Sequence, residues 1–153
     1  MSNLQQLHSP SSTIVYSNDL PYEEKRQIWN SAIDKKPAAI AVCVTEQDVI
    51  AAVQLAKEQQ WPIAVRSGGH HISGFAMCDN GLVIDVQQLK EIDMDTAKQT
   101  VTIGAGVLAG ELNAATQQHG LAVPLGTAST TGVSGVALGG GIGYLRGRYG
   151  SAR

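Results

Sequence analysis

Short apolar runs bounded by proline, glycine and polar residues frame one amphipathic segment in the first half of the chain. The runs at 38–44 and 62–65 are rich in branched residues, which is typical of buried strands. Between them, Thr45-Glu46-Gln47-Asp48 has the form of a capping box, and we expect a helix through Gln59. This order predicts a βαβ unit with a parallel strand pair. The inner face of the helix is expected to carry Val49, Ala52, Val53 and Ala56.

The amino-terminal part is more polar. Residues 1–20 are expected to lie loosely over the surface. A helix is expected to begin near Pro21, which suits a first helical turn, and to end at Lys35-Lys36-Pro37. Asn18 and Asp19 are available as caps, and Ile28, Trp29 and Ile33 recur at helical spacing.

The second half shows four more patterned segments. A strand is expected at 82–86, and runs at 92–95 and 100–103 are typical of a hairpin that turns across 96–99. A helix is expected from about Leu108 to His119, closed by Gly120. The remaining segment, 121–153, is rich in Gly, Thr and Ser and shows little periodicity.

Composition and charge narrow the possible functions. The chain has 153 residues, enough for one domain with a core, and its formal net charge of -2 does not favour nucleic acid or an anionic membrane as partner. No apolar stretch is long enough to cross a bilayer. The first residues resemble no signal peptide, so we expect a cytoplasmic protein. Cys43 and Cys78 form neither a disulfide framework nor a metal set.

A glycine-rich turn, Arg66-Ser67-Gly68-Gly69-His70-His71-Ile72-Ser73-Gly74, follows the strand expected at 62–65. Consecutive glycines let the backbone approach a ligand closely and present N–H groups to an anion. A surface turn with an incidental histidine pair is the alternative. The second glycine-rich segment, 126–143, favours a site for a large phosphate-bearing cofactor over that alternative.

Four other motifs in the chain each have a simpler structural interpretation. Gly104–Ala109 fits a dinucleotide fingerprint, but no acidic residue follows Glu111 to bind a ribose, so a turn into a core helix is favoured. The pair His70 and His71 with Asp79 is an incomplete metal set. Cys78 is either a reactive thiol or, more commonly for a loop, a plain free cysteine. The segment 126–143 lacks a Walker A ending, and its interleaved Val and Leu residues disfavour a flexible linker.

Several motifs, taken in order, resemble the FAD-linked oxidases of the berberine-bridge-enzyme group, within the vanillyl-alcohol oxidase/p-cresol methylhydroxylase superfamily. The resemblance covers nearly everything after residue 20. Its motifs are Arg66–His70, Gly81–Asp85, Gly120–Pro124, Thr131–Gly135 and Leu138–Gly143, with Trp29-Asn30, Pro37–Ile40 and Asp48-Val49.

The resemblance implies an α+β fold: a PCMH-type FAD-binding domain over 37–153 with a small parallel βαβ subdomain, incomplete at its carboxyl end, preceded by a tail and helix over 1–36. FAD would extend between two subdomains, with His70 covalently bonded to the flavin 8α-methyl group. Ala128 stands where many relatives have a second, cysteine link. The implied cofactor-binding residues are Arg66, Ser67, Gly68, Gly69, His70, His71, Gly74, Gly126, Thr127, Thr131, Gly132, Ser134, Gly135, Gly140, Gly141 and Gly143.

The resemblance further implies hydride transfer from an alcohol or sugar carbon of a small substrate to flavin, with dioxygen as the common acceptor. No catalytic base is identifiable. Relatives continue past the motif at 148–150, so the chain is expected to be an amino-terminal part that is inactive alone and self-associates through Val136, Leu138, Ile142 and Leu145. The alternatives are a non-catalytic flavin-binding or remnant domain, and a dehydrogenase of the same fold that holds FAD non-covalently.

Overall fold

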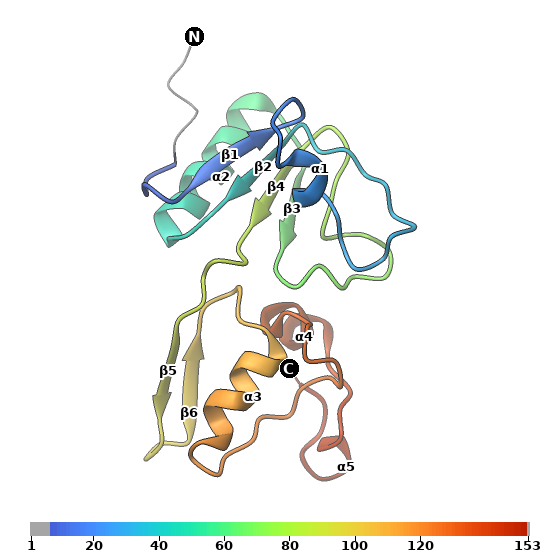
Figure 1. The fold of residues 1–153 in the computed structure, drawn as a ribbon. Coiled ribbons are helices and arrows are strands. Elements are labelled where there is room, and N and C mark those ends of the chain that lie inside the picture. The colour runs from blue at the N-terminus through green and yellow to red at the C-terminus, as the bar shows by residue number, and fades with distance from the viewer. Residues whose placement is uncertain (1–6, 153) are drawn as a thin grey trace. The chain divides into compact units, whose positions relative to one another are not determined.

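The computed structural model describes residues 7–152, which fall into two compact units, one ending at Gln88 and the other beginning at Leu89 (Figure 1). The first unit is built on a four-stranded sheet in the order β1-β2-β4-β3. Its strands are β1 (Thr13–Tyr16), β2 (Ala39–Val42), β3 (Ile63–Arg66) and β4 (Leu82–Asp85). β1 runs antiparallel to β2, whereas β2 and β3 both run parallel to β4.

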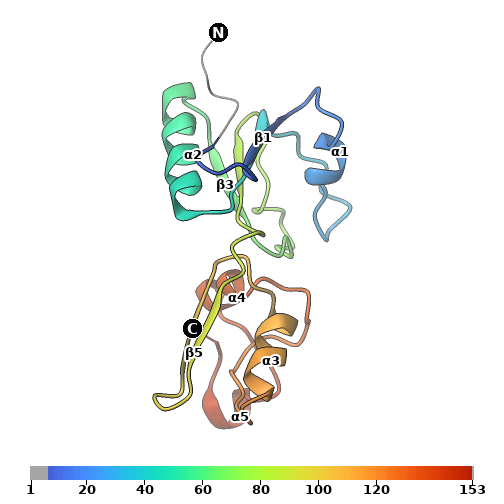
Figure 2. The same ribbon diagram turned by 60° about the vertical axis from the view of Figure 1, so that its left-hand side comes forward.

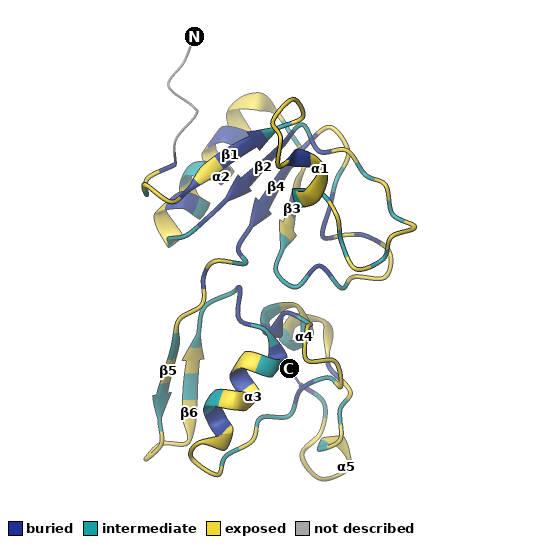
Figure 3. Ribbon diagram, in the orientation of Figure 1, coloured by how far each residue is buried: buried dark blue, intermediate teal, exposed yellow. Residues whose placement is uncertain are grey.

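Two helices cover this sheet. α2 (Glu46–Gln59) and α1 (Tyr22–Lys25) lie on opposite faces of it (Figure 2). On the α1 side, Tyr22 packs with Ile40, Met77 and Val83 in a buried cluster, and the Tyr22 hydroxyl donates a 2.7 Å hydrogen bond to the Pro37 carbonyl. β2 and β4 are buried along their whole length (Figure 3).

The predicted βαβ unit exists, but its two strands are not neighbours. β4 lies between β2 and β3 and pairs with both, with Val83 opposite Ile40 on one side and Ala64 on the other. All four residues of β4 are buried, whereas Ile63 and Val65 of β3 are exposed. β4, whose two faces are both apolar and buried, therefore lies inside the sheet, and β3, which buries one face, lies at its edge.

Two amino-terminal predictions were wrong. Residues 13–16 form β1 instead of a loose surface segment, because the buried Ile14 and Val15 complete the open edge of β2. The helix expected from Pro21 to about 35 ends at Lys25, since the residues after it make tertiary contacts with the glycine-rich turn. Residues 1–6, part of the predicted tail, lie outside the described residues.

α2 confirms the predicted capping box and corrects its inner face. The Thr45 side chain accepts a hydrogen bond from Asp48 N, and the Asp48 carboxylate accepts one from Thr45 N. Ala52, Leu55 and Ala56 are buried, whereas Val53 is exposed. Leu55 replaces Val53 because the helix presents the 48–52–55–56 face to the sheet.

Asp48→Asn is expected to lower the free energy of unfolding at neutral pH by about 1 kcal/mol. Burial opposes ionisation of Asp48, but hydrogen bonds from Thr45 and from the backbone N–H groups of Val44 and Thr45 outweigh it, so the pKa of Asp48 is lowered. The charged group therefore stabilises the fold above its unfolded pKa of about 3.9, and this contribution is lost as pH falls through the folded value. Urea titrations at neutral and acid pH measure it.

The control for this change is Glu58→Gln, which neutralises an exposed carboxylate on the same helix. We expect the gap between Asp48→Asn and the parent to close in acid, while Glu58→Gln follows the parent throughout. A gap that stayed constant down to acid pH would contradict the role assigned to the ionised carboxylate.

The second unit begins with the predicted hairpin, β5 (Ile92–Asp95) and β6 (Thr100–Ile103), paired antiparallel. α3 (Ala109–Gln117) follows, and Gly120 has the left-handed φ of 66° that a helix-ending glycine adopts. Hairpin and helix share one core, made of Val107, Ala109, Leu112, Leu125 and Val133, with Ile92, Val101 and Ile103 packed against it.

Two short helices, α4 (Val133–Gly139) and α5 (Arg146–Tyr149), lie in the segment where no element was predicted. α4 contains two glycines and a serine, so its sequence carries little helical propensity. Within residues 7–152, no helix is long and apolar enough to span a membrane.

Candidate cofactor site

The glycine-rich turn begins where β3 ends, beside the end of β4. Arg66 and Asp85 are register partners on these two parallel strands. Gly69 and Gly74 have φ values of 69° and 70°, a left-handed conformation that side-chain-bearing residues rarely adopt. The carboxyl ends of parallel strands are a common place for ligands in α/β sheets, and this turn occupies such a place.

Arg66 and Asp85 form a buried pair at the base of the turn. Arg66 Nη1 lies 4.0 Å from Asp85 Oδ2, with side chains 14% and 2% exposed. Burial raises the pKa of Asp85, although the Gln87 N–H, Arg66 and Lys25 oppose this shift. Arg66 Nη1 also donates to the Lys25 carbonyl.

Arg66 Nε is buried and has no hydrogen-bond partner among the described residues. A buried N–H without a partner is costly, so it favours an acceptor brought by a ligand. Together with the two glycines, this donor fits the phosphates of a nucleotide cofactor.

The two histidines of the turn lie in different surroundings. The half-buried His70 stacks on Trp29, with ring centroids 5.4 Å apart and planes 22° apart. The exposed His71 accepts a 3.2 Å hydrogen bond at Nδ1 from Ser73 N, and its ring contacts Phe75. The sequence alone gives the two residues the same chemistry, but the structure separates them.

Residues 28–35 cross the turn, and we call this segment the strap. Trp29 N donates to the Gly69 carbonyl at 3.2 Å, and Asn30 Nδ2 donates to the Ile72 carbonyl at 2.8 Å. Lys35 Nζ donates to the carbonyls of Gly74 and Met77, at 2.9 and 3.0 Å. The sequence pattern did not predict these residues as part of the site. The available signal was Trp29-Asn30, which carried the family resemblance but was assigned to a helix.

In the second unit, two hydroxyls of the glycine-rich segment donate hydrogen bonds within the fold. Thr131 Oγ1 donates to the Ala128 carbonyl at 2.7 Å, and Ser134 Oγ donates to the Ala105 carbonyl at 2.8 Å. Gly132 forms an antiparallel bridge with Leu108. In this arrangement the two hydroxyls can accept hydrogen bonds from a ligand, but their own protons are already donated.

The glycines of this segment fall into two groups. A Cβ on Gly141 would lie 2.3 Å from Val136 Cγ1, and one on Gly143 would lie 2.0 Å from the Leu125 oxygen. Packing within the unit therefore requires these two glycines. A Cβ on Gly126 or Gly135 would meet nothing within 4 Å, and Gly140 has a φ of +84°. The open positions leave room for a ligand.

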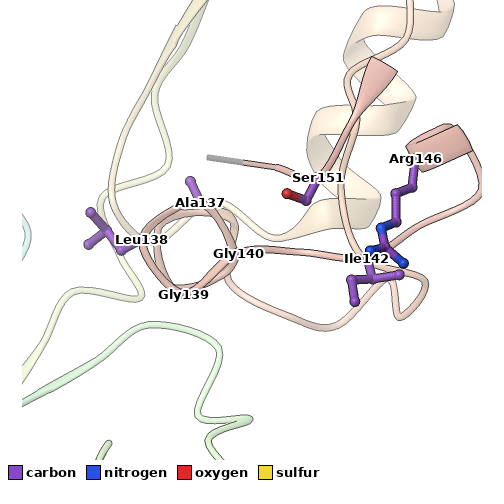
Figure 4. A pocket seen from close by; sticks show the side chains of 7 residues that line it. All are labelled: Ala137, Leu138, Gly139, Gly140, Ile142, Arg146 and Ser151. Atoms are coloured by element: carbon purple, nitrogen blue, oxygen red, sulfur yellow. The ribbon is translucent and has the colours of Figure 1, made fainter. Parts of the chain in front are cut away.

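A hollow of about 630 Å³ lies beside α4 (Figure 4). Its lining is mostly apolar or backbone, with one guanidinium from Arg146 and one hydroxyl from Ser151. Of the predicted cofactor-binding residues, it contains Gly140. Leu138 and Ile142, which also line it, are 92% and 62% exposed.

The remaining candidate chemistry finds no support. Burial raises the pKa of the Cys43 thiol to about 12 and also raises that of Cys78, so both thiols are poor nucleophiles at neutral pH. Across residues 7–152, no three His, Cys, Asp or Glu side chains are grouped to hold a metal. Gly104–Ala109 leads into α3, as favoured, and a Cβ on Gly104 would lie 2.3 Å from the Leu89 oxygen.

A mainly parallel sheet with a glycine-rich turn suited to phosphate, followed by a hairpin and helix unit, is typical of a nucleotide-cofactor-binding protein with mixed helix and sheet. The sequence pattern of the FAD binding domain family matches residues 37–153, and the chain belongs to that family. This family match and the relatives described below confirm the predicted resemblance to FAD-linked oxidases and the predicted PCMH-type fold.

Three comparisons illustrate the relationship. The chain is 36% identical over 139 residues to (R)-6-hydroxynicotine oxidase of Paenarthrobacter nicotinovorans, covering 91% of the chain and 30% of that protein. The crystal structure of 6-hydroxy-D-nicotine oxidase from Arthrobacter nicotinovorans superposes with a TM-score of 0.90 and 35% identity, over 96% of this chain and 33% of that one. The BBE-like 1 protein of Physcomitrella patens gives a TM-score of 0.88 and 29% identity, over 93% and 31%. The chain thus spans about a third of the length of each.

Proposed function

We propose that the chain holds FAD in an oxidoreductase that oxidises an alcohol or sugar carbon of a small organic substrate and uses dioxygen as acceptor. When bound, FAD supplies an acceptor for a hydride from a substrate C–H bond. The observation that carries the proposal is the turn at 66–74, with its unpartnered Arg66 Nε and half-buried His70, in a chain of the FAD-binding family. The similarity to an oxidase of a nicotine derivative supports flavin-dependent oxidation of a small organic molecule.

The chain's own residues bind and orient the cofactor. Backbone N–H groups at Gly68 and Gly69, with Arg66 Nε, would hold the diphosphate, and Ser67, His71 and Gly74 belong to the same turn. A ring nitrogen of His70 would carry the bond to the 8α-methyl carbon. Ala128 offers no sulfur, so this would be the single covalent link. In the second unit, the residues proposed to bind the cofactor are Gly126, Thr127, Thr131, Gly132, Ser134, Gly135, Gly140, Gly141 and Gly143. No residue in the chain is assigned as catalytic.

Self-association is part of the proposal. Leu138 and Ile142 expose most of their surface, and Val136 and Leu145 are half-buried beside them in the sequence. Exposed apolar side chains of this size favour contact with another protein surface. Sedimentation of the protein in dilute and concentrated solution measures this association. The cytoplasmic compartment stays a prediction.

The test uses the natural gene product that contains residues 1–153, purified without added cofactor. We expect a yellow protein whose FAD spectrum bleaches anaerobically with at least one member of a panel of alcohols and sugars. Admission of air should restore the colour and form hydrogen peroxide. Dithionite, which reduces flavin without a substrate site, serves as control.

Three other outcomes separate the alternatives. A yellow protein bleached by dithionite but by no substrate would indicate a non-catalytic flavin-binding domain. Bleaching by substrate with colour restored only by an artificial acceptor would indicate a dehydrogenase and overturn the role of dioxygen. A colourless protein whose melting temperature rises with NAD and not with FAD would overturn the proposal.

A further inference from the structure

We infer that the strap orients His70 for flavin attachment and that Trp29 is the positioning residue that does so. The inference rests on the proposed attachment through His70, and concerns residues outside the glycine-rich turn itself. Trp29 touches His70 and is assigned no contact with substrate.

The geometry joins Trp29 to the turn twice. The backbone N–H of Trp29 donates to the carbonyl of Gly69, the residue directly before His70. The indole of Trp29 stacks on the His70 imidazole, with ring centroids 5.4 Å apart. This hydrogen bond therefore holds the backbone of Trp29 close to the backbone next to His70. An imidazole with one face against an indole loses much of its freedom to rotate.

The strap itself is held on the turn along its length. Asn30 Nδ2 binds the Ile72 carbonyl, and Lys35 Nζ binds the carbonyls of Gly74 and Met77. Between them, a Cβ on Gly74 would lie 2.6 Å from Ile33 Cγ2, so the strap packs directly against the glycine. These contacts fix the backbone from which Trp29 projects.

Core packing does not explain the position of the Trp29 side chain. The residue is 67% exposed, and burial of its ring in the hydrophobic core is therefore not what holds it there. Its aromatic contact is with His70. A role in orienting His70 therefore explains the position of the exposed Trp29 indole better than a role in the stability of the unit.

The same arrangement accounts for the choice between two adjacent histidines. His71 packs against Phe75, and its Nδ1 already accepts the Ser73 N–H. The Nδ1 lone pair of His71 is therefore occupied in a hydrogen bond within the turn. Formation of the N–C bond would break one C–H bond of the 8α-methyl group and one N–H bond of the imidazole. The two electrons and two protons would pass to the flavin, and dioxygen, the proposed acceptor, would then take them as hydrogen peroxide. The step needs a ring nitrogen held in a productive orientation, and the strap supplies this for His70.

The experiment follows the attachment of FAD to the natural protein prepared free of cofactor, with Trp29→Leu, Trp29→Gln and Trp29→Phe as variants. We expect acid-stable flavin to form about tenfold more slowly in Trp29→Leu and Trp29→Gln, equivalent to about 1.4 kcal/mol, a value within the range of an aromatic pair. Trp29→Phe restores a stacking ring and should recover most of the rate. Trp61→Leu, a change of the same kind in the loop after α2, should leave it unaltered.

A second readout does not depend on flavin. In ¹H–¹³C NMR spectra of the cofactor-free protein, the indole should shift the imidazole C–H resonances of His70, and Trp29→Leu should remove that shift while the His71 resonances stay in place. The same spectra show whether each variant is folded. The polar side chain of Trp29→Gln suits an exposed position, so the rate of flavin attachment can be measured with this variant if Trp29→Leu does not fold.

The outcomes separate this inference from the proposed function. Folded Trp29→Leu and Trp29→Gln proteins that attach FAD at the parent rate would overturn the role of the strap. Attachment that moves to His71 in these variants would support it. Acid-stable flavin that persists in His70→Ala would overturn the proposed attachment and this inference with it. Acid-stable flavin that is lost in His70→Ala but forms normally in the Trp29 variants would overturn this inference and leave the proposed function standing.

Discussion

Replacing His70 with alanine is expected to abolish acid-stable flavin, whereas replacing His71 leaves it intact. The two residues are adjacent, yet only His70 is half-buried and stacked on Trp29. Ala128 has no sulfur that could form a second link, so no other covalent bond should hold the cofactor. The effect is all-or-none, because a covalent link either survives denaturation or is absent.

Acid precipitation of the natural protein measures the effect directly. In the parent and in His71→Ala, the yellow colour should stay in the pellet, and a tryptic flavopeptide should contain residue 70. In His70→Ala, all flavin should appear in the supernatant, or none should be bound. Flavin retained in the His70→Ala pellet, or a modified residue 71 in the parent, would refute the assignment.

The second large effect is expected at Gly143, where alanine should destabilise the second unit by about 3 kcal/mol. An added Cβ would lie 2.0 Å from the Leu125 oxygen and 3.0 Å from the Leu125 carbon. These are backbone atoms, which cannot rotate away as the end of a side chain can. The backbone of 125–126 must shift instead, and Leu125 belongs to the core of this unit.

Gly135→Ala is the matched control in the same segment. A Cβ there meets nothing within 4 Å, and the residue lies inside α4, so alanine should stabilise the unit by about 0.5–1 kcal/mol through helix propensity. Hydrogen exchange of the α3 amides in cofactor-free protein reports the stability of this unit. Equal protection in both variants would contradict the packing argument. Weaker FAD binding by Gly135→Ala would support its predicted place at the cofactor.

The elements that were predicted correctly are those that local sequence determines. Thr45 and Asp48 lie three residues apart and satisfy each other's backbone N–H groups, so the start of α2 is determined within one turn. The hairpin β5–β6 likewise joins two segments of alternating apolar and polar residues across the four-residue turn at 96–99. Neither element depends on a distant partner for its identity.

The elements that were missed depend on distant partners. Residues 28–33 have helical spacing, but the Trp29 N–H bonds to Gly69, forty positions away along the chain, and this contact competes with the helix. β1 exists because β2 offers an open edge. The glycine-rich turn was found from its sequence, but the strap that covers it was not, since nothing local distinguishes a strap from a helix.

The central place of β4 has a consequence for the order of folding. β2 and β3 make no ladder with each other, and each pairs with a strand that follows both in the chain. During synthesis, β1 and β2 can pair before β4 is made, while β3 waits for β4. Closure of the β2–β4 ladder brings together residues 43 positions apart, as for Ile40 and Val83, which carries a substantial entropic cost. We therefore expect the glycine-rich turn to acquire its shape in the last folding step of this unit, when β4 enters the sheet.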